Sequence, residues 1–173
     1  TALWHGGDTD DEIGALLQDW KVRTELIQSK DASADIAEVA LNRRAIEVLE
    51  LWVDLAARQD PRAILAKAQR FAASSEYGSL EYLICRDISS GIMMTLGRFV
   101  EAADTALESL KSIPSGSVNE YIAGYQVIST ALRALFAVGD YAKIRALAVS
   151  HEPESPELHL IWSGTLHFWA AFS

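Results

Sequence analysis

The sequence has little of what several protein classes require. It contains one cysteine, Cys85, so no disulfide can form within the chain, and this favours a reducing, cytoplasmic location. It has 15 Lys and Arg against 24 Asp and Glu, a net charge of −9, which argues against a surface that binds nucleic acid or an anionic membrane. We recognise no signal-peptide pattern in these residues and no apolar run long enough to span a bilayer.

Helix-breaking residues are also scarce, and strand-like alternation of apolar and polar residues is rare. Only four of the 173 residues are proline, while half are apolar, enough for a sizeable core. Periodicity and capping signals predict about eight helices in one all-α domain over residues 1–173. The expected helices cover 9–29, 34–58, 61–71, 80–96, 99–112, 117–136, a segment from 140, and 156–173.

Local signals mark where several of these helices begin. Thr9 to Glu12 and Ser117 to Glu120 have the capping-box form, in which each side chain satisfies a free backbone N–H. Asp60 is a good cap before a proline at the first helical position. In the second helix the spacing predicts a buried stripe that includes Trp52.

Two stretches of the chain repeat each other. The segment "TLGRFVEAADTALESLKSIP" aligns with "AVGDYAKIRALAVSHEPESP", so that Gly97 matches Gly139, 42 residues later. Phe99 likewise matches Tyr141, and Pro114 matches Pro156. We expect each glycine to adopt a positive φ at the end of one helix, each aromatic residue to anchor the next helix, and each proline to close the unit.

These residues resemble the tetratricopeptide repeat, whose second helix begins with a glycine, an aromatic residue and a small residue, matched here by Gly97, Phe99 and Ala102. The unit is longer than the usual one of about 34 residues. It therefore looks like the helical solenoid of LuxR-type, maltose-activator-type bacterial transcription regulators. The resemblance implies a right-handed α-α superhelix in which the first helix of each unit lines a concave, ligand-binding surface.

Polar residues on the predicted first helices are the candidate binding residues: Arg43, Glu47, Arg86, Gln126 and Arg133. In the helix over 80–96 the predicted solvent-facing stripe consists of Tyr82, Arg86, Ser89 and Met93. In the helix over 117–136 it includes Thr130 between Gln126 and Arg133. The alternative is that each stripe is an ordinary solvated helix face.

The stretch "GGDTDDE" near the start suggests a metal site. It resembles the magnesium-binding segment of ADP-ribosyl-glycohydrolases and the acidic motif of class II terpene cyclases, and by that resemblance Asp8, Asp10 and Asp11 would be the functional carboxylates. The alternative is an acidic helix N-terminus, favoured by the helix dipole by about 0.3–1 kcal/mol for each carboxylate. We favour the helix cap, and we expect no metal and no other cofactor.

The frame of the repeats predicts that the chain is a fragment of a longer protein. It would begin inside one unit and end in another, at the helix over 156–173, which is apolar nearly all round and could mediate self-association. We expect a non-catalytic domain that binds a protein, a peptide or a small effector, as the sensor segment of a transcription regulator. The alternatives are a scaffold repeat protein and a metal-dependent, all-helical hydrolase fragment.

Overall fold

The computed structural model describes residues 15, 18, 19, 21, 22, 46–55, 57, 59–113 and 123–150, and every regular element in these ranges is helical. The all-α prediction is therefore confirmed for this part of the chain. The chain divides into two compact units, residues 1–67 and 68–173. Each unit is described by itself.

The first unit contains helical residues 46–55 and the start of α3 (Pro61–Ser74). Leu51 is fully buried, whereas Trp52 is 45% exposed, so the prediction that Trp52 belongs to the core is wrong. Apolar residues at successive positions leave the rotation of a helix ambiguous, and tertiary packing selects Leu51. The predicted start of α3 is confirmed, because the Asp60 carboxylate accepts a hydrogen bond from the backbone N–H of Arg62 at 3.1 Å.

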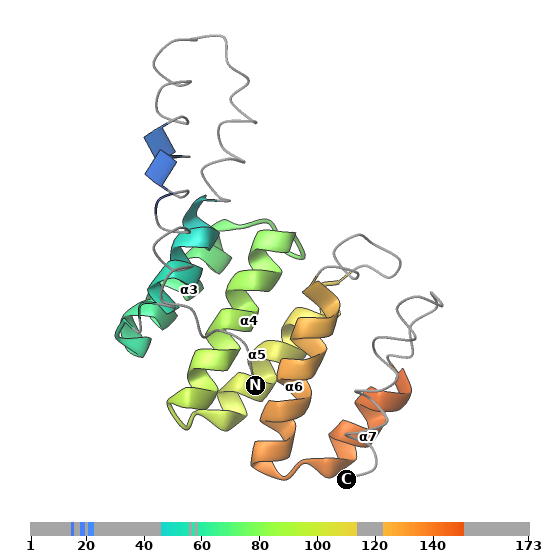
Figure 1. Ribbon diagram of the computed structural model, residues 1–173. Helices are drawn as coiled ribbons and strands as arrows, with labels where there is room; N and C mark the ends of the chain where they lie inside the picture. The colour runs from blue at the N-terminus through green and yellow to red at the C-terminus, as the bar shows by residue number, and fades with distance from the viewer. Residues whose placement is uncertain are drawn as a thin grey trace. The chain divides into compact units, whose positions relative to one another are not determined.

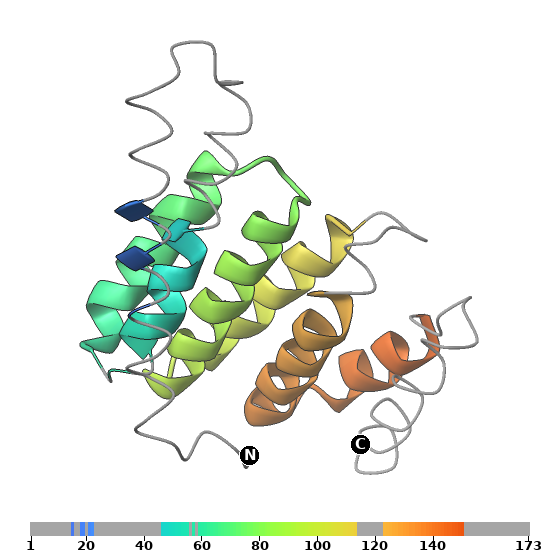
Figure 2. The ribbon, with the colours of Figure 1, turned by 45° about the horizontal axis from the view of Figure 1, so that its top comes forward.

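In the second unit, the described helices that follow the end of α3 form two helical hairpins (Figures 1 and 2). The first consists of α4 (Leu80–Thr95) and α5 (Phe99–Lys111), and the second of α6 (Tyr125–Val138) and α7 (Tyr141–Ser150). Helix α5 packs against both α4 and α6, and α4 also contacts α6. The first helices of the two hairpins are therefore neighbours, and their adjacent faces form one surface.

The same backbone turn closes both hairpins. Gly97 and Gly139 each have a φ of 75°, as predicted from the repeat. In the first turn the N–H of Arg98 donates to the carbonyl of Met93 at 2.8 Å, and the N–H of Gly97 donates to that of Met94 at 3.0 Å. The corresponding bonds in the second turn run from Asp140 to Leu135 and from Gly139 to Phe136, both at 3.0 Å. Both turns are Schellman motifs.

The aromatic residues after these glycines lie at the surface of the turns. The ring of Tyr141 packs edge-on against Phe136, with 5.9 Å between ring centroids, so it does join α7 to the end of α6. Phe99 and Tyr141 are 38% and 41% exposed, respectively. The predicted closing residues Pro114 and Pro156 lie outside the described residues.

The two hairpins differ in how closely their helices approach. In the first, Ser90 and Ala102 are fully buried, and the Ser90 hydroxyl donates to the carbonyl of Ala102 at 2.7 Å. The repeat aligns these residues with Leu132 and Ile144, which are also fully buried. Two large side chains thus replace two small ones, and α7 packs less extensively on α6 than α5 does on α4.

Replacing Gly139 by valine should lower the free energy of unfolding by about 1–3 kcal/mol, because a β-branched residue fits poorly at a positive φ. A Cβ at this position would meet no atom within 4 Å, so the cost comes from the backbone conformation alone. Urea unfolding of the two proteins measures the difference. Gly139→Asn is the control and should cost less, since asparagine tolerates this conformation. A valine variant as stable as the parent would contradict the assigned turn.

Replacing Ala102 by isoleucine should lower the free energy of unfolding by about 1–3 kcal/mol, because the added side chain forces α4 and α5 apart. The matched control is Ala142→Ile on the exposed face of α7, which should leave stability nearly unchanged. Thermal melts of both variants provide the measurement. Equal melting temperatures for the two variants would contradict the close approach at Ala102.

Candidate functional site

A metal site and a membrane span were tested first. Among the described residues, no three His, Cys, Asp or Glu side chains lie together so as to hold a metal ion. None of the helices in the described part of the chain is long and apolar enough to cross a membrane. The acidic residues Asp8, Asp10 and Asp11 lie outside the described residues.

In the first unit, charges on residues 46–55 form an internal cluster. Glu50 forms an ion pair with Lys21 and another with Lys67 at 3.4 Å, and Lys67 also pairs with Asp54 at 2.8 Å. Burial alone would raise the pKa of Glu50, but the hydrogen bonds and charges of the two lysines lower it. Of the predicted binding residues in this region, Glu47 is half-buried and Arg43 lies outside the described residues.

In α4 the predicted solvent-facing stripe is wrong. Ser89 is fully buried and Met93 is only 4% exposed. The Arg86 guanidinium donates to the carbonyl of Thr105 at 3.3 Å and to the hydroxyl of Ser109 at 3.4 Å. This stripe therefore faces α5, and Arg86 serves to join the two helices of the first hairpin.

In α6 the predicted stripe lies where α6 meets α4. Gln126 and Arg133 are exposed, whereas Thr130, between them on the same face, is buried. Arg133 donates to the Thr130 hydroxyl at 3.1 Å. The stripe is therefore accessible at Gln126 and Arg133, and α4 covers it at Thr130.

Asp87 of α4 completes a polar cluster with these α6 residues, and no sequence pattern pointed to it. Burial raises the pKa of its carboxyl group, and a hydrogen bond from Thr130 and the charge of Arg133 offset this effect only in part. Its Oδ1 is buried and has no hydrogen-bond partner among the described residues. Buried carboxylate oxygens almost always have a donor, so this oxygen is exceptional.

One turn further along α4, Gly91 shares the face of Asp87. A Cβ placed on Gly91 would meet no atom within 4 Å, so packing does not require a glycine here. A glycine inside a helix nevertheless costs about 1 kcal/mol relative to alanine. We call the face made of Asp87, Gly91, Gln126, Thr130 and Arg133 the α4/α6 surface.

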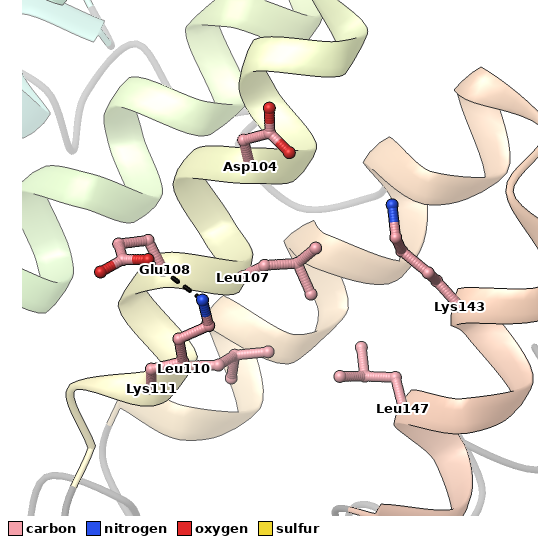
Figure 3. Close-up of a pocket in the computed structure, with 7 residues that line it drawn as sticks. All are labelled: Asp104, Leu107, Glu108, Leu110, Lys111, Lys143 and Leu147. Carbon is pink, nitrogen blue, oxygen red and sulfur yellow. Dashed lines mark hydrogen bonds and ion pairs between the residues drawn. The ribbon is translucent and has the colours of Figure 1, made fainter.

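A second candidate lies between α5 and α7 (Figure 3). This groove has a volume of 480 Å³, and Leu107, Leu110 and Leu147 point into it. Its lysines form local ion pairs, Lys111 with Glu108 of α5 at 3.3 Å and Lys143 with Asp140, the residue before α7, at 2.8 Å. The groove thus offers apolar contact with its lysines already in ion pairs, whereas the α4/α6 surface exposes the polar side chains of Gln126 and Arg133.

Comparison with known proteins adds little. No protein-family model matches the chain, and no solved structure matches it. The chain is similar to ribonuclease R of Aquifex aeolicus (strain VF5), with 26% identity over 110 residues. The match covers 56% of this chain and 16% of that protein, so it shows neither a family nor an activity for the chain.

The stability difference between the parent and an Asp87→Asn variant should depend on pH. The raised pKa means that the folded state binds the Asp87 proton more tightly than the unfolded state. Ionised Asp87 therefore costs stability at neutral pH, and this cost disappears as the pH falls through the raised pKa towards the ordinary aspartate range. We expect the variant to melt at a higher temperature than the parent at neutral pH, and the difference to shrink in acid.

Thermal melts over a series of pH values test this prediction. Glu101→Gln is a control of opposite sign, because the hydrogen bond from Arg98 lowers the pKa of Glu101. That variant should be less stable than the parent at neutral pH and approach it in acid. An Asp87→Asn variant that is less stable than the parent at neutral pH would mean that the ionised carboxylate is stabilised by its surroundings.

Proposed function

We propose that the chain forms part of a non-catalytic helical-repeat domain that binds a peptide or a segment of another protein along the α4/α6 surface. The observation that carries the proposal is the exposure of Gln126 and Arg133 on α6, where α6 meets α4 at the junction of two repeated hairpins.

The repeated architecture supports this proposal. Gly97 and Gly139 close the two hairpins with the same turn, and α4 and α6 contact each other. Stacked hairpins of this kind present extended surfaces made from one helix of each unit, and repeat proteins use such surfaces for binding. The exposed Gln126 and Arg133 add polar groups to this surface that can direct a partner.

The biological setting of the domain is proposed from the resemblance alone. The long units resemble those of LuxR-type regulators, so we propose a sensor segment whose bound partner controls a transcription regulator. A DNA-binding role for this segment is disfavoured by its net charge of −9. An assembly scaffold is the alternative, and it would use the same surface for a permanent partner.

A selection from a library of random linear peptides displayed on phage tests the proposal. We expect peptides that bind the parent chain and that lose binding to Gln126→Trp, whose bulky side chain would obstruct the α4/α6 surface. The matched control is Val100→Trp on α5, where Val100 is 64% exposed. Binding of the selected peptides to purified variants can be measured by calorimetry. Failure to select any peptide, or loss of binding in the Val100 variant alone, would refute the proposal.

A further inference from the structure

Exposed apolar side chains gather at one end of the second unit. Figures 1 and 2 both show the α4–α5 turn and the α6–α7 turn at the same end of that unit. Of the nine large apolar side chains that are exposed in the described part of the chain, five lie at these turns: Phe99, Val100, Phe136, Val138 and Tyr141. Exposed apolar residues that cluster in this way are typical of protein interaction sites.

The charged residues at the two turns have opposite signs at matching positions. In the first hairpin Arg98 forms an ion pair with Glu101. The 42-residue shift matches these two residues to Asp140 and Lys143, which form an ion pair at 2.8 Å with the acidic and basic members exchanged. The side chains of Glu101 and Lys143 are 56% and 60% exposed, so a partner can reach both charges. We call these four charged residues and the five apolar ones the turn-end surface.

A second copy of the chain is the partner that this exchange of charges fits. A two-fold axis that lies in the interface and passes between the two turns brings the α4–α5 turn of one copy against the α6–α7 turn of the other. In that arrangement Arg98 faces Asp140 of the partner subunit, and Glu101 faces Lys143 of the partner subunit. The symmetry repeats both contacts, so opposite charges meet at all four facing positions.

We propose that the turn-end surface joins two copies of the chain in a symmetric dimer, in which apolar contacts supply the affinity and the exchanged charges set the register. Aromatic residues are enriched at such interfaces, and exposed charges contribute more to orientation than to affinity. The Schellman hydrogen bonds of both turns and the packing of Tyr141 on Phe136 form this surface before a partner arrives. The dimer would form whether or not the α4/α6 surface binds a peptide.

Charge reversal at one facing pair tests the register. Glu101→Lys would put two basic side chains opposite each other in the dimer, and Lys143→Glu would put two acidic ones opposite each other. We expect each substitution to weaken dimerisation about ten- to a hundredfold, because two attractive contacts become repulsive. The double variant should dimerise as the parent does. An equimolar mixture of the two single variants should also recover, since each faces its complement in the heterodimer.

Matched controls separate the turn-end surface from the rest of the chain. Glu108→Lys and Lys111→Glu make the same two changes of charge at exposed positions further along α5, and both variants should dimerise as the parent does. Val100→Ser removes an apolar side chain that is 64% exposed at the α4–α5 turn and should weaken the dimer. Val149→Ser, at a side chain of α7 that is 81% exposed, should not.

Sedimentation equilibrium of the 173-residue chain over a range of concentrations measures the dissociation constant of the dimer. Circular dichroism of each variant at a concentration where the parent is monomeric should show the helical content of the parent, because all the substituted side chains are exposed. A parent that stays monomeric at every concentration would overturn the proposal. So would a dimer that forms equally well in both single charge variants, or single variants that do not recover on mixing.

Discussion

The close approach of α4 and α5 at Ser90 and Ala102 determines much of the second unit. Both residues are small and fully buried, and the Ser90 hydroxyl donates a hydrogen bond to the Ala102 carbonyl at the contact. This contact fixes the rotation of α4 about its axis. Because Ser89 and Met93 then face α5, Arg86 is drawn to α5 as well, and Asp87, one position later, faces α6.

The features that the sequence could predict are those specified by local chemistry. Asp60 and Ser79 accept hydrogen bonds from the first turns of α3 and α4, and Gly97 and Gly139 end α4 and α6 at a positive φ, all as their residue types indicate. The rotation of each helix was less predictable. The rotation of a helix depends on which of its apolar side chains pack against neighbouring elements. In the helix over residues 46–55, Leu51 is buried and Trp52 is exposed.

The candidate site could be predicted only in part, for the same reason. Gln126 and Arg133 were found because α6 has one clear polar stripe, and they are exposed as expected. Asp87 was missed because helical periodicity alone made Arg86 the natural surface residue of α4. A detectable signal was present in "LICRDISSG", where an acidic residue stands within an apolar run and a helical glycine follows four residues later. This signal could be interpreted only from the structure, in which α6 contacts α4.

The two hairpins repeat their turns but not their surfaces, and this bears on what the α4/α6 surface can bind. A shift of 42 residues relates Gly97 to Gly139, and the same shift relates Asp87 to Ser129 and Gly91 to Arg133. The positions that close the hairpins are thus repeated, whereas Asp87 and Gly91 have different residues, Ser129 and Arg133, at the matching positions of the second hairpin. If the same two residues recurred in each unit, the surface would suit a ligand with a repeating structure that contacts several units. Because neither Asp87 nor Gly91 recurs, the two hairpins differ at this surface although both end in the same turn.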